Sequence, residues 1–150
     1  MDTFDLESKI EYTPKVLVME YILLKYHNFL KSKLEDKNLS RGDLVFLYNI
    51  FYHDPLSQRE LAELLFVSEA YVTKMLKKLE KKEYIERKVD DEIKSKKIIY
   101  LTDKGHVLTL DFVKITREWE NDLMDLIDYE YKDDLNKVLY TLAYNAHKLE

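Results

Sequence analysis

The stretch LSQRELAELLFVSEAYVTKMLKKLEKKEYIERK, residues 56–88, decides how this chain folds. Ser57 and Glu60 have the S-x-x-E spacing of a capping box, which predicts a short helix ending near residue 65. The tripeptide FVS then turns the chain, and Ser68 is placed to cap a second helix that runs to about Lys82. Two helices joined by a turn of about four residues are typical of a helix-turn-helix.

The second of these helices has an apolar face and a basic face. The apolar residues recur at i, i+3, i+4 and i+7, so we expect the core to contain Val72, Met75, Leu76 and Leu79. The opposite face collects small and hydroxyl residues at the N-terminal end and lysines further along: Ala70, Thr73, Lys74, Lys77, Lys78 and Lys81. A lysine-rich helix face is usually only a solvated surface, so this pattern alone does not establish a binding site.

Charge is divided unevenly along the chain, which has 24 Lys and Arg against 29 Asp and Glu. Residues 1–67 carry 8 basic and 11 acidic side chains, residues 68–104 carry 11 and 8, and residues 105–150 carry 5 and 10. The three segments therefore have net charges of −3, +3 and −5, which sum to the −5 of the whole chain. A basic middle between acidic ends indicates an anionic partner for the middle alone.

The remaining segments predict more helices and one small β unit. Residues 12–36 read as a long helix, residues 38–40 interrupt it, and Ser40 is placed to cap a helix over 41–53 that ends at Asp54-Pro55. Residues 84–89 and 97–101 are predicted strands joined by a charged hairpin tip over 90–96, and helices are expected over 103–127 and 131–149. With only two glycines and two prolines, the fold class expected is mainly α with a small two-stranded β wing.

Several function classes have little support in the sequence. The chain has no cysteine, which excludes disulfides, thiolate zinc sites and a thiol-based redox sensor. The start MDTFDLESKIEY lacks the features of a signal peptide, and no run of 18 apolar residues occurs, so we expect a cytoplasmic protein without a membrane partner. We expect no metal, cofactor or catalytic residues, because no catalytic motif occurs and the histidines are widely spaced: His27, His53, His106 and His147.

An ordered set of residues resembles the winged helix-turn-helix of MarR/SlyA-type transcriptional regulators. The family pattern is matched without a gap at Leu61-Ala62, Val67-Ser68, Val72-Thr73, Leu79-Glu80, Ile85, Arg87, Leu101-Thr102 and Gly105. Two positions depart from it. The D-x-R of the family's wing is replaced by Ile93-Lys94-Ser95, and the glycine that ends the recognition helix is replaced by Glu83. That replacement costs about 1 kcal/mol if the position needs a positive φ.

The resemblance implies a homodimeric, sequence-specific regulator, expected to be a repressor, that binds a pseudo-palindromic operator in double-stranded DNA. It implies an N-terminal dimerisation helix at residues 1–37, a DNA-binding region at 38–104 and C-terminal dimerisation helices at 105–150. Small residues at the start of the recognition helix would contact bases, and lysines and the wing would contact phosphates. The DNA-binding residues expected are Ser68, Ala70, Tyr71, Thr73, Lys74, Lys77, Lys78, Lys81, Arg87, Lys88, Lys94, Lys96 and Lys97.

Members of this family often release DNA when they bind a small anionic or aromatic molecule. The resemblance places such an effector near the first two helices, where the candidate lining residues are Tyr12, Tyr26, His27, Tyr48 and Tyr52. Packing of these tyrosines within the protein is an equally good explanation of them. A second function also stays open, because a winged helix can serve as a protein–protein interaction module whose lysines are merely solvated.

Overall fold

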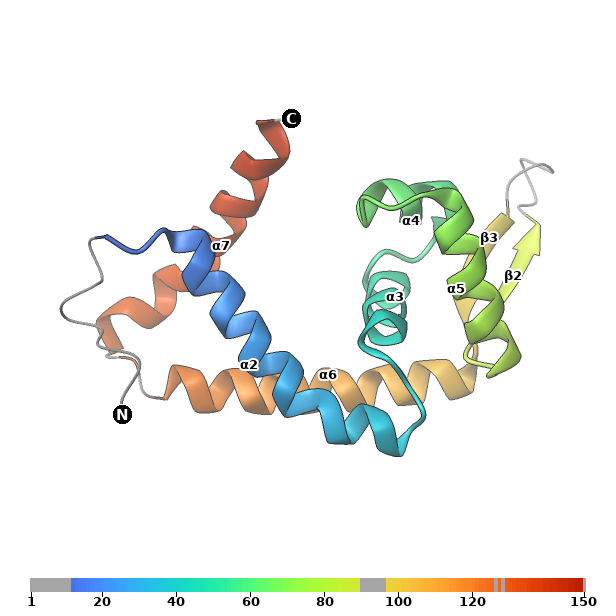
Figure 1. Ribbon diagram of the computed structural model, residues 1–150, viewed down its shortest axis with the longest axis horizontal. Helices are drawn as coiled ribbons and strands as arrows, with labels where there is room; N and C mark the ends of the chain where they lie inside the picture. Colours follow the sequence, from blue (N-terminus) through green and yellow to red (C-terminus); the bar gives the residue numbers. More distant parts are fainter. Residues whose placement is uncertain (1–11, 90–96, 126, 128, 150) are drawn as a thin grey trace. The chain divides into compact units, whose positions relative to one another are not determined.

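The computed structural model describes residues 12–89, 97–125, 127 and 129–149, and Figure 1 shows its helices and strands. The chain forms two compact units, residues 1–109 and residues 110–150. Its elements are α2 (Lys15–Asp36), α3 (Arg41–Tyr52), β1 (Leu56–Ser57), α4 (Gln58–Leu64), α5 (Glu69–Lys81), β2 (Ile85–Val89), β3 (Lys97–Leu101), α6 (Asp103–Met124) and α7 (Tyr129–Lys148). The mainly helical class with a β wing is confirmed. Within the described residues, no helix is long and apolar enough to span a membrane.

The helix starts predicted from serine residues are confirmed. The hydroxyl of Ser40 accepts a hydrogen bond from the backbone of Asp43, whose carboxylate accepts one from the backbone of Ser40 in return. Ser57 and Glu60 form the same reciprocal capping box at the start of α4. Ser68 caps α5 by accepting from the backbone N–H of Tyr71 at 3.2 Å. Each cap satisfies backbone donors that the first turn of a helix leaves without a partner.

The sheet has three strands in the order β1-β3-β2, so the prediction of a two-stranded wing was one strand short. The two predicted strands of the hairpin are present as β2 and β3, which pair antiparallel from Ile85 opposite Leu101 to Val89 opposite Lys97. Strand β1 adds Leu56 opposite Ile99. It was missed because a strand of two residues has no periodicity, and its pairing depends on a partner far along the chain. The predicted hairpin tip, residues 90–96, lies outside the described residues.

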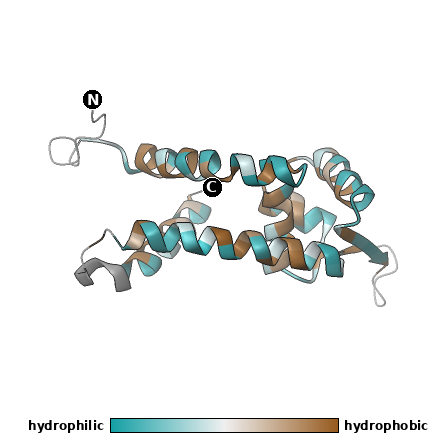
Figure 2. Cartoon of the chain, turned by 90° about the horizontal axis from the view of Figure 1, so that it is seen from below, coloured by the Kyte–Doolittle hydropathy of each residue, from teal (hydrophilic) through white to brown (hydrophobic). Residues whose placement is uncertain are grey.

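The core of the first unit lies among α3, α4, α5 and the sheet. The apolar face predicted for α5 is confirmed, since Val72, Met75, Leu76 and Leu79 are all buried. Fully buried side chains also come from α3, α4 and β3, namely Leu47, Ile50, Leu61 and Ile99. Figure 2 shows hydrophobic and hydrophilic residues alternating along the helices, as expected for helices with one buried face. This core holds the opposite face of α5 toward solvent.

Three helices of the first unit end with a residue in the left-handed conformation, although none of these residues is glycine. The positive φ values are 53° at Asn38, 53° at Phe66 and 61° at Glu83. After α5, the N–H of Glu83 donates to the carbonyl of Glu80 and the N–H of Tyr84 donates to that of Leu79. These two bonds are those of a Schellman motif, which satisfies the last carbonyls of a helix. The expected glycine position therefore does need a positive φ.

Replacing Glu83 with glycine is expected to stabilise the protein by about 1 kcal/mol, because glycine adopts a positive φ without steric cost. The ion pair that would be lost, Glu83 with Lys104 at 3.5 Å, is exposed and contributes little. Thermal unfolding measures the gain. Asn38→Gly serves as the control and should gain less, because asparagine tolerates this conformation. Equal gains in the two variants, or no gain in Glu83→Gly, would contradict this reading of the motif.

The start of α6 is bonded to the chain that follows α5. The backbone N–H of Thr102 donates to the carbonyl of Tyr84 at 3.1 Å, and its hydroxyl donates to the carbonyl of Glu83 at 2.6 Å. Gly105 lies against the same segment so closely that a Cβ there would be 1.9 Å from the carbonyl oxygen of Tyr84. The Leu101-Thr102 and Gly105 positions of the family pattern thus fix the second strand of the wing and α6 to the end of α5.

Candidate nucleic-acid interface

Helix α5 presents three polar faces, whereas the sequence predicted one. At 100° per residue, positions 70, 74, 77 and 81 lie within about 60° of one another, at the centre of the exposed side. Positions 71, 75, 78 and 82 turn toward α3, and positions 69, 73 and 80 turn toward α4 and β2. The contacts below support this division and show which of the expected DNA-binding side chains have partners within the fold.

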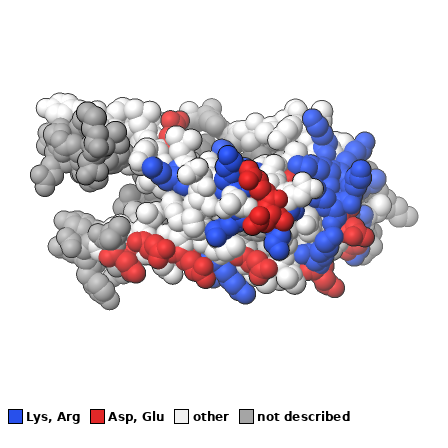
Figure 3. Space-filling model, turned by 60° about the horizontal axis from the view of Figure 1, so that its bottom comes forward, with Lys and Arg blue, Asp and Glu red and all other residues white. Residues whose placement is uncertain are grey.

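The central face carries Ala70, Lys74, Lys77 and Lys81, all exposed. Within the described residues, none of these three lysines has an ion pair or side-chain hydrogen bond. We call Lys74, Lys77 and Lys81 the lysine face. Figure 3 shows Lys and Arg side chains gathered at the end of the molecule that carries α5 and the strands. Together with Ser68 at the N-terminal end of the helix, the lysine face is available to a solvent-side partner.

The α3 side of the helix uses two of the expected DNA-binding residues for internal contacts. The ammonium of Lys78 lies 2.7 Å from the carboxylate of Asp43, whose side chain is fully buried. Tyr71 is partly exposed, and its ring lies edge-on to Phe46 at 6.1 Å between centroids. Lys78, which the sequence grouped with Lys77, therefore has a partner within the fold, a buried carboxylate 35 residues earlier in the sequence.

The α4 side of the helix forms a hydrogen-bonded chain to the wing. Arg87 on β2 donates two bonds of 2.7 Å to the two carboxylate oxygens of Glu80. Its guanidinium also reaches the amide oxygen of Gln58 at 3.5 Å. The amide nitrogen of Gln58 donates to the hydroxyl of Thr73 at 2.7 Å, and that hydroxyl donates to the carbonyl of Glu69. This chain joins α4, α5 and β2, so Arg87 and the Thr73 hydroxyl are engaged in holding the motif together.

Replacing Thr73 with valine is expected to destabilise the protein by about 1 kcal/mol, because the half-buried amide of Gln58 loses its acceptor. Denaturant or thermal unfolding measures the loss. Thr141→Val is the matched control, since the Thr141 hydroxyl makes the same bond to the carbonyl four residues back and is exposed. The prediction fails if the two valine variants are equally stable relative to the unmodified protein.

Among the wing residues that the structure describes, two of the expected cations, Arg87 and Lys88, have partners within the fold. Lys88 lies 2.6 Å from Glu86 and 5.5 Å from the ring centre of Tyr100. The bond to Glu86 raises the pKa of Lys88, although both side chains remain largely exposed. Lys97 is exposed at the start of β3. The expected wing residues Lys94 and Lys96 lie outside the described residues.

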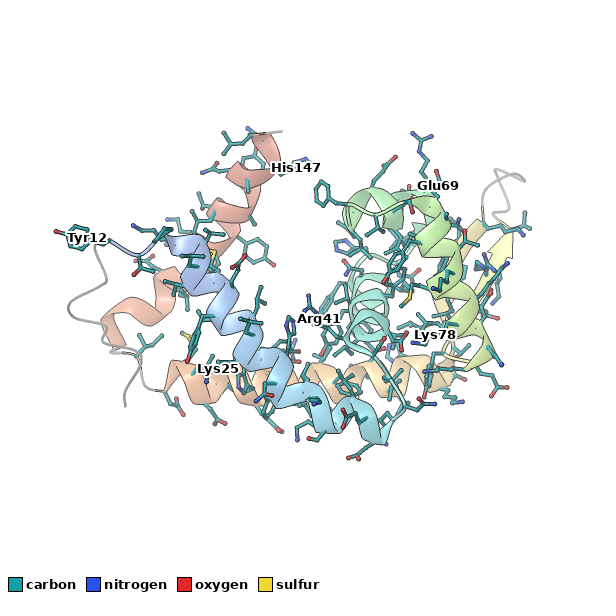
Figure 4. The ribbon with its side chains drawn as sticks, in the orientation of Figure 1. Tyr12, Lys25, Arg41, Glu69, Lys78 and His147 are labelled. Carbon is teal, nitrogen blue, oxygen red and sulfur yellow. The ribbon has the colours of Figure 1, made fainter. Side chains whose placement is uncertain are left out.

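Four of the five candidate effector residues lie on α2 and α3. Tyr26 and His27 are neighbours on α2 with ring centres 5.9 Å apart. Arg41, labelled in Figure 4, donates to Nδ1 of His27 at 3.0 Å. Burial and the Arg41 charge lower the pKa of His27, so it is neutral at pH 7. Tyr52 contacts Phe51, and Tyr48 is half-buried on the same helix. Tyr12 is 85% exposed.

Sequence reasoning missed Asp43 and Gln58 as parts of this interface. Asp43 follows Ser40 at the capping-box spacing, so its part in capping α3 could be predicted from the sequence. That spacing does not predict its ion pair with Lys78. Nothing local marks Gln58, because its partners lie 15 and 29 residues away. Among the described residues, no group of three or more His, Asp or Glu side chains is arranged to hold a metal ion.

A three-helix core with a recognition helix and a paired wing is a winged helix-turn-helix. The sequence pattern of the MarR family matches residues 39–92. The chain is 31% identical over 115 residues to the HTH-type transcriptional regulator BilQ of Clostridium symbiosum, covering 77% of this chain and 80% of BilQ. It is also 30% identical over 122 residues to an uncharacterized HTH-type transcriptional regulator of Bacillus cereus, covering 78% of this chain and 79% of that protein. The chain therefore belongs to the MarR family of transcriptional regulators.

Solved structures agree in fold. A crystal structure of MarR superposes with a TM-score of 0.80 at 24% identity, covering 92% of this chain and 94% of that one. A MepR–DNA complex from S. aureus superposes with a TM-score of 0.72 at 24% identity, covering 89% of this chain and 99% of the MepR chain. The shared fold thus includes the helices on both sides of the winged motif as well as the motif itself.

Proposed function

We propose that this protein binds double-stranded DNA through α5 and the wing and represses transcription as a homodimer on a pseudo-palindromic operator. The observation that carries the proposal is the lysine face, three ammonium groups on the exposed side of a recognition helix that α3, α4 and β2 hold from behind. A helix held in this way fits the major groove of DNA. The MepR–DNA complex is a fold relative captured with the same class of partner.

The polar contacts of α5 suggest which side chains contact phosphates and which contact bases. Lys77 and Lys81 would neutralise phosphates, since their exposed ammonium groups have no carboxylate partner within the described chain. Ala70 and Lys74, nearer the N-terminal end, would contact base edges, where an alanine methyl suits thymine and a lysine suits guanine. Ser68 and the free N–H groups at the helix start would hold a further phosphate. On the wing, Lys88 and Lys97 would contact the backbone, together with Lys94 and Lys96.

Exposed apolar residues support the homodimer. Helix α2 exposes Val16, Leu17, Tyr21, Ile22, Leu23 and Leu24, and α7 exposes Val138, Leu139, Tyr140, Leu142 and Tyr144. Contiguous apolar surface of this kind on a helix is usually covered by a partner. A two-fold dimer would present two recognition helices to half-sites about 10 base pairs apart.

Selection of bound sequences from a random duplex pool tests the proposal. We expect the selection to recover an inverted repeat. The affinity for that duplex should fall steeply as salt is raised, and the protein should sediment as a dimer at micromolar concentration. Recovery of unrelated sequences with no salt dependence would instead favour the protein-interaction module. A monomer that binds the recovered site with full affinity would overturn the dimer while leaving DNA binding intact.

The pair of His27 and Arg41 supports release by a small aromatic anion. Arg41 offers a guanidinium to a carboxylate, His27 is hydrogen-bonded to it, the ring of Tyr26 lies beside that of His27, and Tyr48 is on the same helix as Arg41. Such a ligand would act by binding more tightly to the form that does not bind DNA. Titrating salicylate into the DNA complex should release the protein, and a Tyr26→Phe, His27→Ala, Tyr48→Phe variant should resist it. Undiminished release from the variant would place the effector elsewhere.

A further inference from the structure

Asp43 is a fully buried carboxylate that DNA contact does not explain. Its Oδ2 accepts the backbone N–H of Ser40 at 2.8 Å and the ammonium of Lys78 at 2.7 Å, and the ammonium of Lys82 lies 3.7 Å away. Its Oδ1 has no hydrogen-bond partner among the described residues. Burial alone would raise the pKa of Asp43, but its bonds to Lys78 and Ser40 lower it below the ordinary value. The group is therefore a carboxylate at neutral pH, held by charges from α5.

The contacts of Asp43 join three parts of the first unit. Asp43 and Ser40 belong to the start of α3, and Lys78 and Lys82 lie one turn apart on the same side of the end of α5. The ammonium of Lys82 also donates to the carbonyl of Asn38, just after α2. We call Ser40, Asp43, Lys78 and Lys82 the Asp43 cluster. It bonds the C-terminal half of the recognition helix to the corner between α2 and α3, and Figure 4 labels Lys78 on α5.

We propose that the Asp43 cluster positions the recognition helix for specific DNA binding, and that Lys78 acts through Asp43 rather than on a phosphate. The proposal rests on the proposed function of DNA binding. A helix fixed about its own axis keeps Ala70 and Lys74 aligned with base edges, and position 78 lies only about 40° from position 74 around the helix. Breaking the ion pair would release that rotation and free Lys78 to contact DNA without sequence preference.

Neighbouring lysines give the first test. Affinity for the selected duplex and for random duplex is measured against salt for Lys78→Met and for its matched control Lys77→Met. Lys77→Met should lower both affinities alike and flatten the salt slope by about 0.9. Lys78→Met should leave the slope unchanged and lower the ratio of specific to random affinity by about tenfold. Lys78→Arg, which keeps the charge, should restore that ratio. A slope loss in Lys78→Met equal to that in Lys77→Met would overturn the proposal.

Asp43→Asn gives a second test, in which the salt slope is expected to steepen, whereas Lys77→Met flattens it. Asparagine keeps an oxygen for the N–H of Ser40 but carries no charge for either lysine. Affinity for random duplex should rise and the salt slope steepen by about one unit, because Lys78 becomes free for a phosphate, while preference for the selected site falls. Unchanged preference would show that the cluster has no positioning role. If Asp43→Asn does not fold, the Lys78 variants alone decide.

A DNA-free measurement separates this proposal from the proposed function. In a double-mutant cycle of Asp43→Asn and Lys78→Gln, each single change should lower Tm by about 5 °C, and the double variant should lose less than the sum. Additive losses would show that the ion pair couples nothing, whatever the protein binds. An unmodified protein that binds no duplex would refute the proposed function, and the cycle would still decide whether the pair couples α3 to α5.

Discussion

Replacing Gly105 with alanine is expected to destabilise the protein by about 3 kcal/mol or more, the largest stability loss that we predict from a single methyl group. The added Cβ would lie 1.9 Å from the carbonyl oxygen of Tyr84 and 2.8 Å from its carbonyl carbon. Both atoms are backbone, and that oxygen already accepts the N–H of Thr102. The clash can be relieved only by moving α6 away from the end of α5. Thermal unfolding should show a Tm lower by roughly 10 °C.

Gly42→Ala is the control for this substitution. A Cβ at Gly42 would lie 3.5 Å from the terminal methyl of Met75 and 3.7 Å from the hydroxyl of Tyr71, which are ordinary contacts. Because alanine favours a helix over glycine by about 1 kcal/mol, Gly42→Ala should be neutral or stabilising. If Gly105→Ala unfolds at the same temperature as the unmodified protein, the close approach to Tyr84 is not a feature of the folded state.

The parts of the fold that the sequence predicted correctly are those determined by neighbouring residues. Ser40, Ser57 and Ser68 each cap a helix with a backbone N–H three residues further along, so both partners were visible in a window of four residues. The buried face of α5 was likewise predictable, because helix periodicity repeats within two turns. For Glu83 the sequence left open whether the family's glycine position needs a positive φ, and the structure shows a φ of 61° there.

The candidate site was only partly predictable because its polar contacts join distant segments. Helix periodicity predicted that Thr73 and Lys78 lie on the same exposed face as the three residues of the lysine face. Their partners, Gln58 and Asp43, lie 15 and 35 residues earlier in the chain and engage these side chains within the fold. A pattern within one helix cannot distinguish a lysine that faces solvent from one that meets a buried carboxylate. Only the structure therefore shows which cations of a recognition helix are free and which have partners within the fold.

Two further features had no local signal. Strand β1 exists because Leu56 and Ser57 pair with Ile99 and Ile98, more than forty residues away, and not because of any strand propensity in two residues. Phe66 adopts a φ of 53° and is 72% exposed, where sequence rules would expect a glycine or an asparagine. The N–H of Phe66 donates to the carbonyl of Glu63 and that of Val67 to the carbonyl of Ala62, so the helix-end motif found after α5 also holds Phe66 in this conformation.

Replacing Lys74, Lys77 and Lys81 together with glutamine is expected to produce the largest loss of DNA affinity. If Lys77 and Lys81 each neutralise one phosphate, the slope of log affinity against log salt should flatten by about 1.8, from about 0.9 per contact. At physiological salt this corresponds to a loss of roughly thirtyfold for random duplex, and the selected duplex should lose more because Lys74 no longer contacts a base edge. Stability should be nearly unchanged, because the three side chains are exposed and make no ion pair within the described chain. Fluorescence anisotropy over a salt series measures both quantities.

The control for this variant removes the same charge elsewhere. Lys31, Lys37 and Lys114 are exposed lysines outside α5 and the wing, and their replacement with glutamine changes the net charge by the same three units. If the lysine face acts by contact, the control should keep its salt slope within about half a unit, because exposed charges more than about 10 Å from the phosphates are screened. Equal losses in the two variants would mean that DNA responds only to the net charge of the protein. Recognition by α5 would then have to be abandoned, even though its helix-turn-helix geometry is intact.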